Sequence, residues 1–194
     1  MEIRIHKILK GSRANGPGLR NTVWIQGCML DCPGCFNPQT HDPKGGQSIS
    51  VRALCTELLS CPCDGITISG GEPFQQPQAL HELLRLLQQR CAPPILVFSG
   101  YTYRELLGNE DAAACLPLID ALICGPFRRE IAPAYDRFCS SANQKLVLLT
   151  DRYSQKDFAG LPLREFVFDT EGNVTVSGIL QLPGTESGSF SAAR

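Results

Sequence analysis

The sequence predicts an α/β fold in which strands and helices alternate along the chain. Short apolar runs that end at Gln26, Ser69 and Phe98 have strand character, and segments with leucines at helical spacing lie between them. Each run is followed directly by a stretch rich in glycine, serine or cysteine. Such alternation predicts parallel βαβ units with right-handed crossovers. It places the stretches after the strands at one edge of the sheet, where folds of this kind bind ligands.

The strands follow from apolar runs bounded by turn residues. The N-terminal residues 1–6 alternate like a strand, and they lack the apolar region of a signal peptide. Further strands are expected at 22–26, 65–69, 95–98, within 118–124 and at 145–149. The residues after four of these strands, beginning at Cys28, Gly70, Ser99 and Gly125, are therefore expected to meet on one face.

Three helices are expected between the strands. The first has one apolar face and Ser50 as its N-cap; that face consists of Val51, Leu54, Cys55, Leu58 and Leu59. The second contains Leu80, Leu83, Leu84 and Leu87, with Pro77 near its first turn. The third is short and covers 103–107.

The chain is expected to form one domain over residues 1–182, with a core at about 16–150. Residues 166–168 and 174–176 alternate like two strands on either side of a polar turn, which predicts a C-terminal β-hairpin over about 164–180. Residues 183–194 are mostly glycine, serine, threonine and charged residues, and we expect a flexible tail.

Composition narrows the functional class. The 194 residues are 43% hydrophobic, which suffices for one core. A net charge of -1 gives no indication of a nucleic-acid or membrane surface, and no apolar run reaches the ~20 residues of a membrane span. We therefore expect a cytoplasmic protein. Its ten cysteines are then expected to be thiols and metal ligands rather than disulfides.

Cys28, Cys32 and Cys35 form a C-x3-C-x2-C pattern directly after a predicted strand. Three thiolates can bind three irons of a four-iron cluster and leave the fourth open for a substrate or cofactor. The same cysteines with His41 would also suit a Cys3His zinc site. Spacing alone leaves both possibilities open.

Several ordered motifs carry a resemblance to a known family. They are Asn15-Gly16-Pro17-Gly18-Leu19-Arg20, Cys32-Pro33-Gly34-Cys35-Phe36-Asn37-Pro38, Ser69-Gly70-Gly71-Glu72-Pro73, Ser99-Gly100-Tyr101-Thr102 and Ser140-Ser141-Ala142-Asn143-Gln144. Together they resemble the radical S-adenosylmethionine (SAM) enzymes, and among these the glycyl-radical-enzyme activases, especially the activators of anaerobic ribonucleotide reductase. The chain has too few βα units for an eight-fold barrel, and the resemblance implies an open, partial (βα)6-type radical SAM barrel.

The resemblance implies a 4Fe–4S cluster on Cys28, Cys32 and Cys35, and SAM as second cofactor. The residues implied to contact SAM are Phe36, Asn37, Gly70, Gly71, Glu72, Pro73, Ser99, Gly100, Asn143 and Gln144. Each has a simpler interpretation: Phe36 could only pack beneath the loop, 70–73 and 99–100 could be turns, and 143–144 a solvated loop. Glycines at 70 and 71 would let the backbone approach a ligand closely.

The implied reaction is reductive cleavage of SAM to a 5′-deoxyadenosyl radical, which abstracts hydrogen from a backbone glycine of a partner enzyme. No catalytic residue beyond the cluster and SAM is required. The implied partners are a glycyl-radical enzyme of the anaerobic ribonucleotide reductase kind and a flavodoxin or ferredoxin as electron donor. Two departures from the family pattern are Cys124, where an aspartate is usual, and the loop 140–144, where Cys139 replaces a glycine and Ala142 is inserted. They leave open a small-molecule substrate, as in 7-carboxy-7-deazaguanine synthase, or a peptide; a non-enzymatic iron–sulfur or zinc protein is a further alternative.

Overall fold

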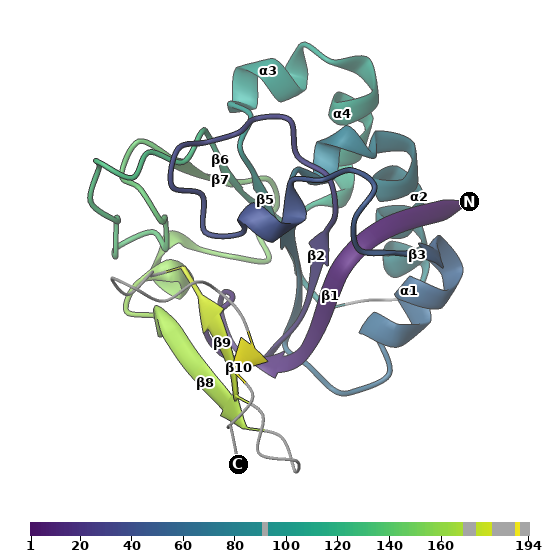
Figure 1. The fold of residues 1–194 in the computed structure, drawn as a ribbon, viewed down its shortest axis with the longest axis horizontal. Coiled ribbons are helices and arrows are strands. Elements are labelled where there is room, and N and C mark those ends of the chain that lie inside the picture. Colours follow the sequence, from purple (N-terminus) through teal and green to yellow (C-terminus); the bar gives the residue numbers. More distant parts are fainter. Residues whose placement is uncertain (91–92, 169–173, 180–188, 191–194) are drawn as a thin grey trace.

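The computed structural model describes residues 1–90, 93–168, 174–179 and 189–190. Its main element is a seven-stranded mixed sheet (Figure 1). In spatial order the strands are β3 (Gln47–Ser50), β1 (Glu2–Ser12), β2 (Arg20–Ile25), β4 (Gly65–Gly70), β5 (Ile95–Ser99), β6 (Ala121–Cys124) and β7 (Lys145–Leu148). The predicted α/β class is therefore confirmed in this coarse form.

The four central strands β2, β4, β5 and β6 are parallel, as the alternation predicted. The outer strands are antiparallel: β1 to β2, β3 to β1 and β7 to β6. The predicted parallel βαβ arrangement is therefore confirmed from β2 to β6 and does not extend to β7. A long irregular segment, not a helix, joins β6 to β7, so the chain returns down the sheet in the opposite direction.

The expected helices are present, and the structure adds a fourth. The α-helices are α1 (Val51–Leu58), α2 (Pro77–Gln89), α3 (Tyr103–Leu107) and α4 (Glu110–Cys115). The side chain of Ser50 accepts a hydrogen bond from the Ala53 amide and caps α1, as predicted. Sequence reasoning missed α4 because a run of three alanines shows no apolar periodicity; its N-cap is Asn109. The described residues also form four short 3-10 helices: η1 (Pro38–Thr40), η2 (Pro73–Gln75), η3 (Leu116–Leu118) and η4 (Gln155–Phe158).

The two faces of the sheet pack against different material. Helices α1, α2 and α4 cover one face (Figure 1). There the leucines of α2 belong to the same buried cluster as Ile66, Ile68 and Val97. On the other face, Leu96 and Ile123 pack in one cluster with Phe138, from the segment after β6, and with Phe158 of η4. This second face has no long helix over it among the described residues, which leaves room for a pocket.

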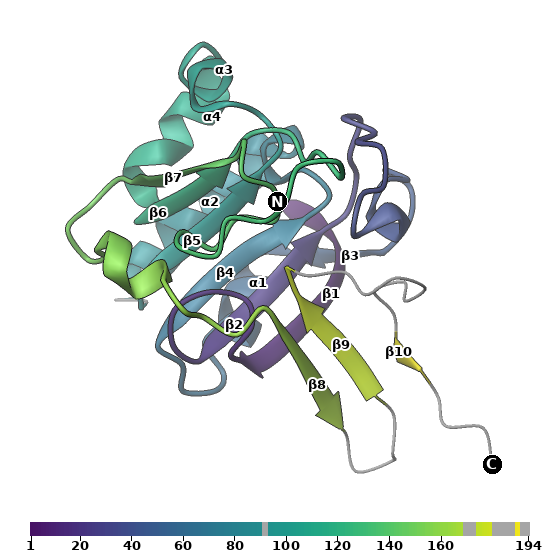
Figure 2. The same ribbon diagram turned by 90° about the vertical axis from the view of Figure 1, so that its left-hand side faces the viewer.

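The predicted C-terminal hairpin is confirmed. Strands β8 (Arg164–Phe168) and β9 (Val174–Gly178) pair antiparallel, and β10 (Ser189–Phe190) pairs with β9. The hairpin extends away from the main sheet (Figure 2). Its turn at 169–173, and the predicted tail at 183–194 apart from β10, lie outside the described residues.

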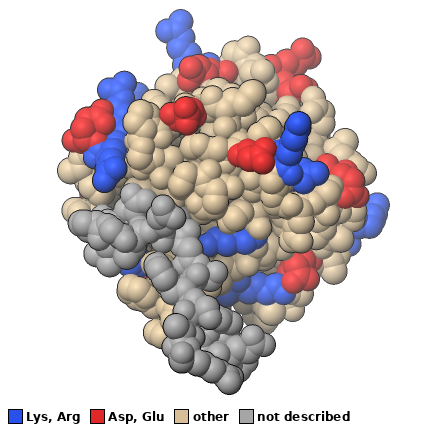
Figure 3. Space-filling view, in the orientation of Figure 1, with Lys and Arg blue, Asp and Glu red and all other residues tan. Residues whose placement is uncertain are grey.

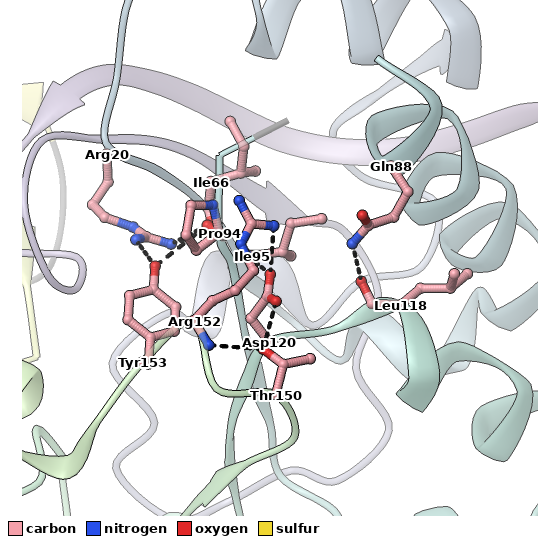
Figure 4. A network of polar contacts seen from close by, with 10 residues as sticks. All are labelled: Arg20, Ile66, Gln88, Pro94, Ile95, Leu118, Asp120, Thr150, Arg152 and Tyr153. Atoms are coloured by element: carbon pink, nitrogen blue, oxygen red, sulfur yellow. Dashed lines mark hydrogen bonds and ion pairs between the residues drawn. The ribbon is translucent and has the colours of Figure 1, made fainter. Parts of the chain in front are cut away.

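A buried polar network joins the amino-terminal ends of the parallel strands. Arg20 is fully buried and donates to Tyr153, to the Thr67 hydroxyl and to the Ile66 carbonyl. Asp120, just before β6, accepts hydrogen bonds from the Ile95 amide at 2.7 Å and the Thr150 hydroxyl at 2.8 Å (Figure 4). These contacts connect the strands at the end opposite to the cysteine loop and to the glycine-rich segments that follow β4 and β5.

The surface shows no single dominant charge in the view of Figure 3, where acidic and basic side chains are interspersed. This agrees with the net charge of -1. Within the described residues, no helix is long and apolar enough to cross a membrane.

Candidate functional site

A single cleft brings together residues from most of the sequence motifs. The empty space between its walls is about 810 Å³, a volume that includes open solvent. The predicted site residues that line it are Cys28, Cys32, Cys35, Phe36, Asn37, Gly70, Gly71, Glu72, Ser99, Gly100 and Gln144. They come from the segments that follow β2, β4 and β5, and from the loop before β7.

The three cysteines lie on a loop that leaves β2 and returns through η1. Three of its residues adopt left-handed backbone conformations: Gly27 (φ +96), Asp31 (φ +45) and Gly34 (φ +71). The Cys28 amide donates to the carbonyl of His41 at 3.1 Å, and the Gly27 amide donates to the carbonyl of Thr40 at 2.7 Å. The return segment therefore holds the start of this cluster loop, here defined as residues 27–41, against the sheet.

The environment of the thiols suits metal binding. Burial raises the pKa of Cys28 and Cys35, and the neighbouring cysteines raise both pKa values further. Cationic irons would relieve this cost, because a bound metal favours the thiolate. The Asn37 amide also donates to Cys35 Sγ at 3.4 Å, a contact that holds this sulfur toward the cleft.

Gly70 and Gly71 approach the protein's own backbone. A Cβ on Gly70, whose φ is +117, would lie 2.2 Å from the amide nitrogen of Ile25; one on Gly71 would lie 2.3 Å from the carbonyl oxygen of Gly27. The Gly71 amide donates to the Ile25 carbonyl at 2.8 Å, and the Glu72 amide donates to the Gly27 carbonyl at 2.9 Å. The glycines thus extend the contact of β4 with β2 into the first residue of the cluster loop.

Glu72 is fully buried and faces the segment after β5. Its carboxylate accepts hydrogen bonds from the Gly100 amide at 2.7 Å, the Ser99 hydroxyl at 3.0 Å and the Phe74 amide at 3.1 Å. Burial raises the pKa of Glu72 to about 7, although these hydrogen bonds lower it. The Glu72 carboxylate therefore connects the segment after β4 to the segment after β5, and both segments line the cleft.

The segment after β5 packs against the cluster loop. The Ser99 hydroxyl donates to Glu72 and accepts from the Tyr101 amide at 3.1 Å, so its hydrogen bonds remain within the protein. A Cβ on Gly100 would lie 2.4 Å from a methyl carbon of Leu30. Gly100 thereby lets the cluster loop approach β5.

Gln144 braces the altered loop 140–144. Its amide oxygen accepts from the Ser140 hydroxyl at 2.8 Å, and its amide nitrogen donates to the carbonyl of Gly125 at 3.1 Å. Asn143 donates to the carbonyl of Pro126 at 2.7 Å. Gln144 and Ser140 line the cleft, whereas Asn143 does not.

Two other residues singled out in the sequence do not line the cleft. Pro73 is buried at the first position of η2. Cys124 is buried in the core beneath the helices, and burial raises its pKa. The substitution of Cys124 for the usual aspartate therefore changes the core behind the cleft rather than its lining.

Sequence reasoning missed much of the apolar lining. The additional lining residues are Asn15, Trp24, Leu30, Ser69, Phe98, Phe127, Ser140, Gly178 and Ile179. Phe127 packs on Phe36 with ring centroids 4.5 Å apart. Asn15, Ser69, Ser140 and Phe127 belong to segments already singled out in the sequence, whereas nothing in the sequence placed the end of β9 at this cleft.

The residues present fit both groups that the resemblance implied. Three thiols face one cleft, and the open space beside them is bordered by backbone and amide groups that suit a polar cofactor. Within the described ranges, no three His, Cys, Asp or Glu side chains converge on a single metal ion. Cluster ligands each bind a different iron and need not converge in this way. His41, required for the zinc alternative, does not line the cleft; its Nδ1 lies 3.6 Å from Asp31 Oδ1.

Comparison with known proteins gives consistent similarities. Residues 14–147 match the family model described as a 4Fe-4S single cluster domain. The anaerobic ribonucleoside-triphosphate reductase-activating protein of Escherichia coli K12 is 33% identical over 140 residues, which cover 67% of this chain and 88% of that protein. The protein of the same name from Salmonella typhimurium is 30% identical over 152 residues, or 73% of this chain and 96% of its own. The pyruvate formate-lyase-activating enzyme of Clostridium pasteurianum is 34% identical over 117 residues, 56% of this chain; the match spans only about half (49%) of that enzyme.

Proposed function

Because this chain belongs to the glycyl-radical-enzyme activating proteins of the radical SAM type, we propose that it generates a glycyl radical on a partner enzyme of the anaerobic ribonucleotide reductase kind. It is an oxidoreductase whose cofactors are a 4Fe–4S cluster and SAM. The structural observation that carries the proposal is the cleft. Three thiols share it with the glycine-rich ends of two parallel strands, and it is partly open to solvent.

We assign the cluster to Cys28, Cys32 and Cys35. Together, the bound cluster and SAM supply reductive cleavage of the sulfonium, which yields a radical able to take hydrogen from a glycine. The protein's contribution is to hold the two cofactors in a fixed geometry and to keep water from the reacting atoms. The buried contacts of Gly70, Gly71 and Glu72 support this role, because they connect the cluster loop rigidly to β4 and β5.

For SAM we propose contacts in three parts of the cleft. The backbone of Gly70 and Gly71 would accept hydrogen bonds from the methionyl ammonium, with Glu72 and Pro73 behind it. Ser99 and Gly100 would lie beside the ribose, where Glu72 orients the Ser99 hydroxyl. Gln144 would border the adenine or the carboxylate, and Asn143, which does not line the cleft, would position this loop through its hydrogen bond to the Pro126 carbonyl. Phe36 and Asn37 would approach SAM from the cluster loop.

The finer architectural and cellular assignments also belong to the proposal. The consecutive parallel pairings of β2, β4, β5 and β6 support an open, partial (βα)6-type barrel. A flavodoxin or ferredoxin would donate the electron. The protein would act in the cytoplasm, because cysteine thiols stay reduced there and remain available as metal ligands.

The proposal is tested with anaerobically reconstituted protein. Iron, sulfide and 5′-deoxyadenosine are quantified with a chemical reductant, and electron paramagnetic resonance is recorded after addition of the organism's anaerobic ribonucleotide reductase. We expect a cluster, SAM cleavage and a glycyl radical on the reductase. The triple variant Cys28→Ala, Cys32→Ala and Cys35→Ala should lack all three, whereas the exposed-cysteine control Cys61→Ala should keep them. SAM cleavage without any radical on the reductase would instead favour a small-molecule or peptide substrate.

A further inference from the structure

The C-terminal hairpin is anchored to the loop that precedes β2. Asn15 donates from Nδ2 to the Ser177 hydroxyl on β9 at 2.7 Å, and also to the Ser12 hydroxyl. Glu165 on β8 accepts from the Ser12 hydroxyl and, at 2.8 Å, from the Arg13 amide. Ser12, Asn15 and Ser177 are all buried. The hairpin is therefore held by satisfied buried polar groups.

One end of the hairpin forms part of the cofactor cleft. Gly178, the last residue of β9, and Ile179 both line it. The Ile179 amide donates to the Leu163 carbonyl at 2.9 Å, and a Cβ on Gly178 would lie 2.2 Å from that same carbonyl oxygen. These contacts hold the two strands of the hairpin close together at the cleft.

The other end of β8 presents phenylalanines to solvent. Phe166 is 54% exposed and Phe168 is 70% exposed, whereas Val167 between them is only partly exposed. Alternate residues of a strand share one face, so the two rings lie side by side on the outer face of the hairpin. Phe168 lies four residues beyond Arg164, which pairs with Gly178 at the cleft, and thus roughly 13 Å along the strand from the cleft.

The backbone of β8 is also available. In the three-stranded sheet the order is β10-β9-β8, so β8 is an edge strand with no second strand partner among the described residues. An edge strand with exposed aromatic side chains suits a partner that adds an extended segment beside it. Large exposed aromatic side chains without a structural role indicate an interaction surface.

We propose that the outer face of the hairpin, defined by Phe166 and Phe168, docks an apolar extended segment of the glycyl-radical partner next to its target glycine. This inference rests on the proposed function, because only a protein substrate must bring a backbone glycine into the cleft. The same hairpin offers apolar docking residues at one end and the cleft wall at the other. A segment bound along β8 would therefore be led toward the cofactors.

The test compares the double variant Phe166→Ser and Phe168→Ser with Leu107→Ser. Leu107 is also 54% exposed, but it lies on α3, at the end of the molecule opposite to the hairpin (Figures 1 and 2). Reconstituted proteins are titrated anaerobically against the organism's anaerobic ribonucleotide reductase. SAM cleavage without the reductase, the glycyl radical signal with it, and the mass in solution by light scattering are recorded in parallel.

We expect the dissociation constant of the double variant to rise by at least about tenfold and its glycyl radical yield to fall, since aromatic anchors dominate protein interfaces. Its SAM cleavage without the reductase should equal that of the wild type, and Leu107→Ser should match the wild type throughout. Unchanged affinity and radical yield in the double variant would overturn the docking surface while leaving the proposed function intact. A wild-type dimer that the double variant converts to a monomer would also overturn it, because a second copy would then cover this face. If the wild type itself forms no radical on the reductase, that result overturns the proposed function and, with it, the docking surface.

Discussion

Replacement of Gly71 by alanine should prevent proper assembly of the cluster rather than only weaken SAM binding. The added methyl group would lie 2.3 Å from the carbonyl oxygen of Gly27 and 3.0 Å from that of Thr40, and a Cβ essentially never comes within 3.0 Å of another heavy atom. Both obstacles are backbone atoms of the cluster loop. They cannot rotate away as a flexible side chain could.

Gly71→Ala should lower the stability of the folded protein because the cluster loop has to move. To relieve the contact, the start of this loop must shift away from β4, which strains the hydrogen bond from the Glu72 amide to the Gly27 carbonyl (2.9 Å). Overpacking of this kind costs about 1–3 kcal/mol. For a chain of this size that corresponds to a fall in Tm of roughly 2–12 °C. Since Cys28 follows Gly27 directly, one of the three proposed cluster ligands moves with the loop.

The assay combines iron and sulfide content after anaerobic reconstitution with thermal unfolding and SAM affinity. Gly108→Ala is the matched control, because its Cβ would meet only ordinary contacts at 3.4 and 3.6 Å in a right-handed conformation. We expect the control to be neutral or slightly stabilised. The reasoning is refuted if Gly71→Ala binds a full cluster, unfolds at the wild-type temperature and loses SAM affinity alone. In that case the glycine would be needed for close approach of the ligand.

Three further substitutions test the buried polar groups. Burial raises the pKa of Glu72 from the ordinary 4.5 to about 7, so the folded protein binds this proton more tightly than the unfolded chain does. The resulting contribution to the free energy of unfolding is fully present below pH 4.5 and is lost as the pH rises through 7. Glu72→Gln should remove this pH dependence from urea unfolding of the apo-protein, and an unchanged pH dependence would contradict the assignment. Tyr153→Phe removes an acceptor from buried Arg20 and should cost about 1–3 kcal/mol in denaturant unfolding, whereas exposed Tyr135→Phe should have no effect. Asn15→Ala should accelerate amide hydrogen exchange in β9 by loosening the anchor of the hairpin, and wild-type exchange rates there would argue against that anchor.

Local sequence patterns predicted the helices and strands well where one apolar face dominated. The leucine spacing of α2, the Ser50 cap of α1 and the alternation of β8 and β9 are properties of neighbouring residues, and the structure confirms them. The direction of β7 could not be predicted in this way. A strand of four residues has the same pattern in either direction, and only the irregular connection from β6 sets its orientation.

The order of motifs along the chain, by itself, identified the family and placed the cysteines and glycine-rich segments at the ends of successive strands. This works because cluster ligation and tight backbone approach demand particular residue types at short spacing. What each group contacts was decided only by the tertiary structure. Glu72 and Gly100 are 28 positions apart, and Asn15 and Ser177 are 162 apart, yet each pair shares a hydrogen bond. Such contacts arise when strands and hairpin pack together, so Glu72 became an internal brace and the end of β9 became a wall of the cleft.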